Sequence, residues 1–173
     1  MAHPVTFRQY QAADYDVVAA LWTRINRELA PAGMEGMFEQ YIATIIDGEL
    51  KQLVEVFSEE KRNAFWVVES AGEIVGCFGI ESHGADDTEL RRMYLDKGHR
   101  GAGIAQRMID HALSEARALG FKKMILSTAE IQRSAVAFYR KSGFRQIRTE
   151  TAETMNPKQA GGGLTRFYFE KAL

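Results

Sequence analysis

Apolar residues along the chain recur at two spacings, one typical of strands and one typical of helices. Residues 5–10 (VTFRQY) alternate between apolar and polar positions and predict a first strand. Apolar residues three and four positions apart follow at 17–25, behind a helix-capping Asp14. The same spacing at 37–57 is interrupted at Gly48, and it predicts one kinked helix or two short ones.

The middle of the chain is rich in β-branched and aromatic residues. Residues 64–70 (AFWVVES) and 73–82 (EIVGCFGIES) are separated by Ala-Gly and predict a hairpin. A further strand is predicted at 86–96. An amphipathic helix is then predicted from Ile104, and Gly120 ends it.

In the last third of the chain, the spacing of apolar residues again alternates between that of strands and that of helices. It predicts a buried strand at 122–129, a helix stopped by Gly143, and strands at 144–151 and 164–173, with a flexible loop at 155–163. The sequence has no internal repeat and no linker long enough to divide it, so one domain over residues 1–173 is expected. The order of elements predicts an α+β fold around one mixed sheet.

Composition limits the possible partners. The 173 residues are 46% hydrophobic and 26% charged, with a formal net charge of −1. This balance gives no reason to expect nucleic acid or a membrane as a partner. The N-terminus lacks an apolar targeting segment, so a cytoplasmic protein is expected. The four histidines are scattered and predict no metal site, and the single cysteine, Cys77, is expected to be a small buried hydrophobe.

The stretch HRGAGIAQ (99–106) places two glycines between a strand and a helix. A helix start has amide N–H groups without partners and a partial positive charge, which suits a phosphate. Gly101 and Gly103 allow close approach to the backbone, and Arg100 adds a full positive charge. No Gly-Lys-Ser/Thr follows, and Gln106 occupies the third position of the dinucleotide fingerprint, so both nucleotide motifs are incomplete. Taken alone, the stretch is also compatible with a simple tight turn.

Two segments around this turn resemble the GNAT superfamily of N-acetyltransferases. The run ELRRMYLDKGHRGAGIAQRMIDHAL resembles its central motif, R/Q-x-x-G-x-G/A at a helix start, with Arg100, Gly103 and Ala105 in those places. The run STAEIQRSAVAFYRKSGF resembles its later motif, in which Tyr139 stands shortly before Gly143-Phe144. Together the resemblance covers essentially the whole chain. It implies a mostly antiparallel sheet of about seven strands, splayed in the middle and flanked by about four helices.

The resemblance also implies acetyl-CoA as co-substrate, with no metal. Its diphosphate would lie against Arg100 and the backbone N–H groups of six residues, namely Gly101, Ala102, Gly103, Ile104, Ala105 and Gln106. Its pantetheine would pair with the main chain of Met93, Tyr94 and Leu95. The family often has Asn where this chain has Gln132. Either Gln132 or Ser134 is expected to bond to pantetheine instead, or neither; Ser134 is alternatively a helix N-cap.

Acetyl transfer from a thioester to an amine needs a base for the ammonium and an acid for the leaving thiolate. The family places Tyr139 beside the sulfur, which makes it the candidate acid. Glu89, at the start of the strand that leads to the donor site, is the candidate base. It would act directly, through a water, or by attracting a cationic acceptor. Asp86, Asp87 and Glu81 are competing carboxylates.

The remaining expectations concern the backbone and three side chains of the donor strand. The N–H of Leu95 is a candidate donor to the thioester oxygen. Arg91 and Arg92 are adjacent in a strand and are expected on opposite faces, and Tyr94 is expected in the core or in the groove. Direct transfer in a ternary complex is expected, and a covalent route through Cys77 is the alternative.

The acceptor is left open by the sequence. In GNAT folds, segments corresponding to 26–37 and 155–163 border the acceptor groove, and here they carry charges of both signs. A primary amine is expected, on a small molecule or a peptide. Two rival functions are a non-catalytic acyl-CoA-binding sensor or regulator and a nucleotide-binding protein. Exposed edges of the final strands permit a homodimer without requiring one.

Overall fold

The computed structural model describes residues 4–173, which form a seven-stranded sheet in the order β1-β2-β3-β4-β5-β7-β6. The strands are β1 Val5–Gln9, β2 Ala64–Ser70, β3 Glu73–His83, β4 Asp87–Leu95, β5 Lys123–Ala129, β6 Arg145–Ala152 and β7 Leu164–Ala172. Strands β4 and β5 run parallel, and the other neighbours run antiparallel. The predicted α+β fold with a mixed, mostly antiparallel sheet is therefore confirmed.

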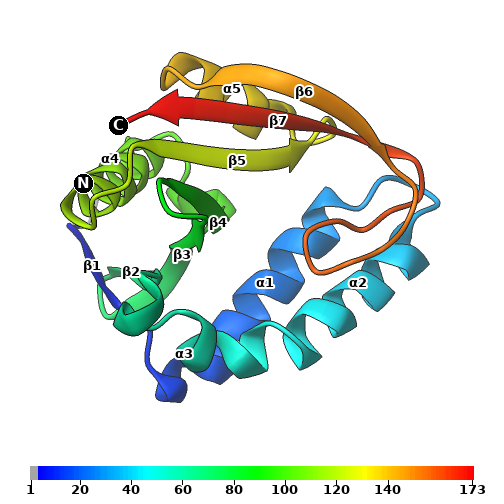
Figure 1. The fold of residues 1–173 in the computed structure, drawn as a ribbon. Coiled ribbons are helices and arrows are strands. Elements are labelled where there is room, and N and C mark those ends of the chain that lie inside the picture. Colours follow the sequence, from blue (N-terminus) through cyan, green and yellow to red (C-terminus); the bar gives the residue numbers. More distant parts are fainter. Residues whose placement is uncertain (1–3) are drawn as a thin grey trace.

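Helices cover both faces of the sheet (Figure 1). They are α1 Tyr15–Leu29, α2 Glu35–Asp47, the single turn α3 Leu53–Val56, α4 Ile104–Ala118 and α5 Arg133–Lys141, with short 3-10 turns η1 Ala12–Asp14, η2 Leu50–Gln52, η3 Glu59–Lys61 and η4 Lys97–His99. The apolar run at 37–57 thus forms separate helices, one of the two predicted outcomes. Within residues 4–173, no helix combines the length and apolar character needed to cross a membrane.

The alternation of β2 explains the two layers. Phe65 and Val67 pack in one core with the apolar residues of α1 and α2. Trp66 and Val68, which point to the opposite face, pack in a second core with α4 and α5. The strand is apolar at all four positions because both of its faces are covered by helices.

The sheet is split in its middle. Strands β4 and β5 pair only at Asp87, Thr88 and Glu89, opposite Lys123, Met124 and Ile125. Beyond Glu89 they diverge, so residues 90–95 and 126–129 have no strand partner on their facing edges (Figure 1). This confirms the splayed sheet that the family resemblance implied.

Two local expectations near the N-terminus are wrong. Asp14 directly precedes α1, but it makes no side-chain cap bond to that helix. Its carboxylate accepts from the Gln11 amide at 2.8 Å and from the Arg8 guanidinium at 2.7 Å. Val17, predicted on the buried face of α1, is 49% exposed.

The segment expected as a flexible loop, residues 155–163, lies between β6 and β7 and is held against α2. Ala160 is buried, and the Tyr41 hydroxyl donates to the Pro157 carbonyl at 3.3 Å. Gly162 lies so close to Met37 that a Cβ there would clash with the thioether. The loop therefore forms one fixed wall of the space beside α2.

A buried histidine on α4 predicts loss of stability in acid. His111 packs edge-on against Phe7, Trp66 and Phe78, and its Nε2 is buried without a hydrogen-bond partner. Burial lowers the pKa of His111. The folded state therefore binds the proton less readily than the unfolded state, whose histidine pKa is about 6.5. This contribution to stability is complete above about pH 6.5 and decreases as the pH falls.

We expect the free energy of unfolding to fall between pH 7 and pH 5 more steeply in the wild type than in His111→Phe. Denaturant unfolding of both proteins at pH 5, 6 and 7 measures the difference. Carboxylates contribute equally to both curves, so their effect cancels. Parallel pH dependences would show that His111 is not responsible.

Candidate active site

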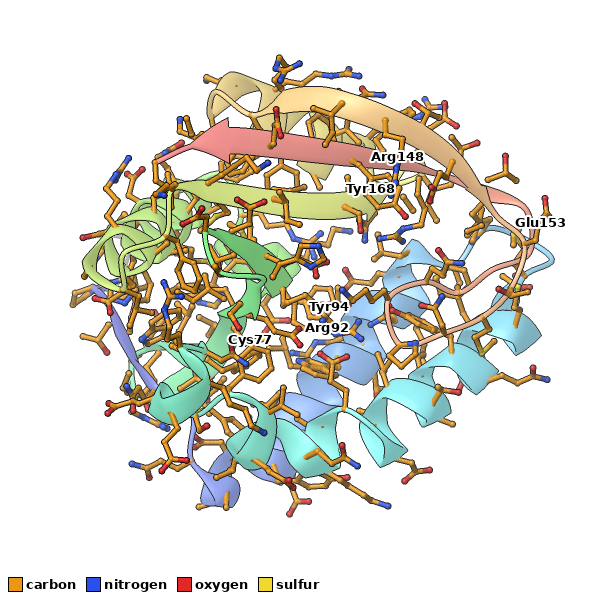
Figure 2. The ribbon with its side chains drawn as sticks, in the orientation of Figure 1. Cys77, Arg92, Tyr94, Arg148, Glu153 and Tyr168 are labelled. Carbon is orange, nitrogen blue, oxygen red and sulfur yellow. The ribbon has the colours of Figure 1, made fainter. Side chains whose placement is uncertain are left out.

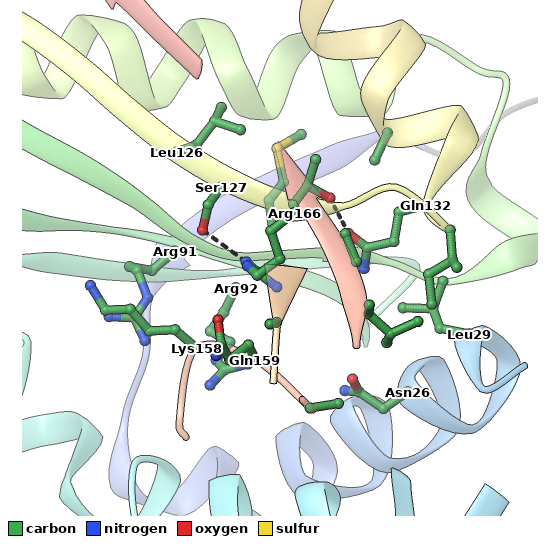
Figure 3. A pocket seen from close by; sticks show the side chains of 18 of the residues that line it. Asn26, Leu29, Arg91, Arg92, Leu126, Ser127, Gln132, Lys158, Gln159 and Arg166 are labelled. Carbon is green, nitrogen blue, oxygen red and sulfur yellow. Dashed lines mark hydrogen bonds between the residues drawn. The ribbon is translucent and has the colours of Figure 1, made fainter. Parts of the chain in front are cut away.

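A cavity lies where β4 and β5 diverge (Figure 3). Its walls come from these two strands, from α1, α2 and α5, and from residues 152–161 and β7. Both segments expected to border an acceptor groove contribute, through Asn26 and Leu29 and through Lys158 and Gln159. The charged residues that line it within the described chain are Glu89, Arg91, Arg92, Lys158 and Arg166.

The glycine turn lies between β4 and α4. Gly101 and Gly103 have φ of +84° and +76°, a conformation that favours glycine. A Cβ on either would meet nothing within 4 Å, so the space in front of the turn is open. The N–H groups of residues 101–106 have no hydrogen-bond acceptor within residues 4–173. The next amide along the chain, that of Arg107, donates to the Gly103 carbonyl. Six unpartnered amides at a helix start fit a diphosphate.

Arg100 fastens this turn to the end of β4. Its Nε donates to the Leu95 carbonyl at 2.9 Å, and its terminal nitrogen pairs with Glu28 at 3.3 Å. The guanidinium is partly exposed, so its charge lies at the edge of the open space. This placement is compatible with an anion at the turn.

The main-chain N–H of Leu95, the candidate donor to the thioester oxygen, lies on the edge of β4 that faces the gap. The amide of Asp96 donates to the Val75 carbonyl of β3 at 2.8 Å. Because amide directions alternate along a strand, the amide of Leu95 points away from β3, toward the gap. Met93 and Tyr94 line the same cavity. The strand therefore presents free main-chain groups to whatever occupies the gap.

Tyr139 on α5 also lines the cavity, from the far side of the gap. It is 8% exposed and packs against Phe144 and Phe169. Burial raises the pKa of its phenol. The hydroxyl therefore stays protonated at neutral pH and can act as a proton donor. Tyr139 also packs beside Phe138, with 5.5 Å between the ring centroids, but a hydroxyl in solvent does not fit its burial.

Glu89 lies at the apex of the split, where β4 and β5 make their last pair. It is 8% exposed, and its carboxylate forms an ion pair with the ammonium of Lys158. The three competing carboxylates are paired elsewhere: Asp86 with Lys122, Asp87 with Lys123 and Glu81 with Arg91. Of these four, Glu89 is the one that lines the cavity.

Arg91 and Arg92 point to the same side, so the prediction of opposite faces is wrong. Gly79 pairs with Arg91 and Cys77 with Tyr94, so one residue of β3 stands opposite two of β4. Arg92 sits in this β-bulge with φ +50°. The extra residue turns both guanidinium groups toward one carboxylate, that of Glu49.

Tyr94 is partly buried between the sheet and α1, next to Arg92 (Figure 2). Its hydroxyl lies 3.4 Å from both Asn26 Nδ2 and an Arg92 nitrogen. Burial raises the pKa of Tyr94. The residue belongs to the core by packing and to the cavity wall by its polar end, so both expected placements apply.

Cys77 is fully buried on the α1 side of the sheet, as expected. The Trp22 indole donates to its sulfur at 3.3 Å. Burial raises the pKa of the thiol to about 12. A buried thiol that stays protonated is a poor nucleophile, and Cys77 does not line the cavity.

Gln132 lines the cavity and accepts a hydrogen bond from the Thr128 hydroxyl, which fixes its side chain (Figure 3). Ser134 is exposed and does not line the cavity. The reading of Ser134 as a helix N-cap is wrong, because that position belongs to Gln132. Of the two candidates for a pantetheine contact, the geometry favours Gln132.

Arg166 was not identified from the sequence. It lies on β7 opposite Ala129 of β5 and projects into the cavity, where it donates to Ser127 Oγ at 2.8 Å (Figure 3). A signal existed: Leu164, Arg166 and Tyr168 share one face of a largely apolar strand. An arginine on such a face is unusual. Its contacts come from β5, about forty residues earlier in the chain, so the sequence pattern alone does not show that it reaches a cavity.

The sequence model of the acetyltransferase (GNAT) family matches residues 22–144, which include β4, the glycine turn and α5. The chain belongs to this family. Uncharacterized N-acetyltransferase YjgM of Escherichia coli (strain K12) is 37% identical over 107 residues, covering 60% of this chain and 64% of that protein. N-acetyltransferase 8 of Homo sapiens is 31% identical, covering 62% and 49%. The matches span about half to two thirds of these curated relatives.

Solved structures of GNAT proteins share the fold over nearly the whole chain. An acetyltransferase from Staphylococcus aureus Mu50 superposes with a TM-score of 0.78, covering 98% of this chain and 99% of that one at 18% identity. The PaiA N-acetyltransferase of Thermoplasma acidophilum, solved in complex with coenzyme A, gives 0.76, with 98% and 99% covered at 17% identity. At these identities the likeness establishes the fold alone.

Proposed function

We propose that this GNAT protein is an acetyl-CoA-dependent N-acetyltransferase that acts on a primary amine by direct transfer in a ternary complex. The observation that carries this proposal is the opening between β4 and β5. The turn that follows β4 carries six amides without acceptors within residues 4–173, and Tyr139 and Glu89 line the cavity inside the opening. Anion binding, a proton donor and a proton acceptor are thus gathered around one gap.

The donor would be held by backbone groups. The amides of 101–106 bind the diphosphate, and the unpaired edge of β4 pairs with the pantetheine amides as an added strand would. Gln132, which lines the cavity, would bond to the same arm from the other side. Negative charge that develops on the thioester oxygen is stabilised by the Leu95 amide, which already points into the gap.

The protein's residues would then move two protons. Glu89 takes a proton from the acceptor ammonium, and the neutral nitrogen attacks the thioester carbon. The C–N bond forms, the C–S bond breaks, and Tyr139 donates its proton to the departing sulfur. Solvent accepts the second nitrogen proton as the amide forms, returns the phenol to its protonated state and takes the proton from Glu89, so that one proton is released in each turnover. Holding both reactants together supplies much of the rate enhancement.

A panel of primary amines mixed with the protein and acetyl-CoA tests the proposal, with release of free thiol as the measurement. Turnover above the buffer rate on at least one amine supports the enzyme. Tight coenzyme A binding without turnover on any amine would instead indicate an acyl-CoA sensor. Competition by ATP as strong as that by coenzyme A would indicate a nucleotide-binding protein.

The glycine turn gives a matched pair of variants. Gly103 has φ +76°, and alanine there costs roughly 1–2 kcal/mol, so the turn is expected to shift and misalign its amides. Gly98, five residues earlier, is equally open but does not have a left-handed φ. We expect Gly103→Ala to raise the dissociation constant of coenzyme A about tenfold, and Gly98→Ala to leave it nearly unchanged. Calorimetry checks both, and equal affinities in the two variants would contradict the diphosphate site.

A further inference from the structure

Arg166 is a buried cation that has no ion-pair partner among the described residues. It is only 9% exposed, and its side-chain polar contacts are with neutral hydroxyl groups, those of Ser127 and Tyr168. No carboxylate of residues 4–173 lies within ion-pair distance of it. Burial lowers the pKa of Arg166. The phenols of Tyr41, Tyr168 and Tyr94 are near enough to oppose this shift in part. A buried guanidinium normally has an anionic partner, because desolvation of an unpaired charge is unfavourable.

The other arginines of the cavity do not share this property. Arg91 and Arg92 both contact Glu49, and Arg91 also contacts Glu81. Two cations and two carboxylates therefore balance on that wall. These arginines belong to a closed ion-pair network and are not free to receive an anion without breaking it. The side of the cavity formed by β5 and β7 retains the unbalanced charge.

Glu89 binds an ammonium group that belongs to the chain itself, that of Lys158. This ammonium, carried on the loop between β6 and β7, forms an ion pair with the buried Glu89 carboxylate. The Lys158 side chain is 47% exposed, so it can move into solvent when another cation takes its place on the buried Glu89 carboxylate. An acceptor ammonium has the same charge and the same hydrogen-bond donors. Lys158 therefore occupies the position where the proposed mechanism needs the amine of the substrate.

Arg166 and Glu89 both line one cavity, and they call for ligand groups of opposite charge: an anion for Arg166 and a cation for Glu89. Resting on the proposed function, we infer that the acceptor is a free amino acid or a closely similar molecule: its ammonium replaces Lys158 on Glu89, and its carboxylate pairs with Arg166. A zwitterion satisfies both groups at once, whereas a polyamine would add positive charge beside an unpaired arginine. A peptide N-terminus carries no carboxylate near its amine unless the side chain supplies one.

The same arrangement favours release of the product. Acetylation converts the ammonium into a neutral amide, which has no charge to offer Glu89. Lys158 then regains its carboxylate and displaces the acetylated nitrogen. The Lys158 ammonium and the substrate ammonium thus bind the Glu89 carboxylate in turn.

Matched acceptors test the inference. We would measure kcat and KM for common free L-amino acids and for their α-amides, which keep the amine and lose the carboxylate charge. Aspartate with asparagine and glutamate with glutamine separate a side-chain carboxylate from the α-carboxylate. At least one carboxylate is expected to improve kcat/KM by about 10- to 100-fold, the effect of one hydrogen-bonded charge pair. Equal use of the acids and their amides would overturn the inference while leaving the acetyltransferase proposal intact.

Variants of Arg166 identify the group that recognises the carboxylate. Arg166→Gln should raise KM for the preferred acid by a similar factor, leave its amide nearly unchanged, and leave coenzyme A binding unchanged. Arg166→Lys should recover part of the loss. Arg148→Gln, which removes an exposed arginine of β6, is the control. Equal losses on acid and amide, or weaker coenzyme A binding, would show that Arg166 has a structural or donor-binding role.

A binding measurement keeps the inference testable if transfer is not observed. With coenzyme A present, the preferred amino acid should raise the melting temperature of the wild type but not of Arg166→Gln. No stabilisation by any free amino acid would overturn the inference. Absence of both turnover and coenzyme A binding would instead count against the proposed function.

Discussion

Glu89→Gln is expected to lower kcat/KM for acetyl transfer at neutral pH by roughly 100- to 10,000-fold, the usual contribution of a general base. The amide has nearly the same shape as the carboxylate but can neither accept the acceptor's proton nor balance its charge. An alkyl ammonium has a pKa of about 10.4, so the reactive neutral amine is scarce at neutral pH without a base. Glu89 also lies at the last β4–β5 pair, which fixes its backbone beside the gap.

The pH dependence separates this role from a merely structural one. As the pH rises toward the pKa of the amine, solvent supplies the neutral form, so the wild-type and Glu89→Gln rates should converge. Asp87→Asn is the matched control, because Asp87 lies two residues earlier on β4 and pairs with Lys123 outside the cavity. A loss that stays constant from pH 7 to pH 10 would indicate that Glu89 only binds the acceptor.

Tyr139→Phe is expected to lower kcat on the order of 100-fold while coenzyme A binding stays within about twofold of the wild type. The leaving thiol has an ordinary pKa of about 8.5, so the departing sulfur takes up a proton at neutral pH, and a donor beside it supplies that proton as the C–S bond breaks. Burial raises the pKa of Tyr139, so the phenol is protonated throughout the neutral range and gives up its proton only as negative charge develops on the sulfur. Phenylalanine preserves the packing on Phe144 and Phe169 and removes only the hydroxyl.

Single-turnover thiol release measures this effect, with Tyr10→Phe as the control. Tyr10 packs against Phe65 in the core on the α1 side and does not line the cavity. Its hydroxyl should therefore be dispensable for transfer. An unchanged kcat in Tyr139→Phe would mean that solvent protonates the sulfur. A large loss of coenzyme A affinity would mean that the phenol is a donor-binding group.

Much of the fold could be predicted from the sequence because it depends on local patterns. The β-branched and aromatic residues of β2 and β3, the apolar stripe of α4 and the glycines at 101 and 103 each specify their own structure within about twenty residues. The α2–α3 region stayed ambiguous, since Gly48 can either kink a helix or end one. The loop at 153–163 contains polar residues and glycines, and its packing on α2 depends on side chains more than a hundred residues away.

The candidate site was only partly predictable for the same reason. Glu89, Tyr139 and the glycine turn belong to local motifs that carry their own spacing. The bulge at Arg92 left no such trace, and without it two adjacent arginines are expected on opposite faces. Arg166 and Lys158 reach the cavity from the last strand and the loop before it, so their meeting with Ser127 and Glu89 follows from tertiary structure alone.

The split between β4 and β5 has a consequence for the integrity of the sheet during turnover. Three residue pairs at Asp87–Glu89 join its two halves, and the rest of the seam has no protein partner. On the proposed mode of binding, the pantetheine arm completes this seam, so the substrate is temporarily a structural component of the enzyme. Each cycle then opens and closes the middle of the sheet, and backbone amides along the seam should exchange with deuterium faster in the free protein than in the loaded one.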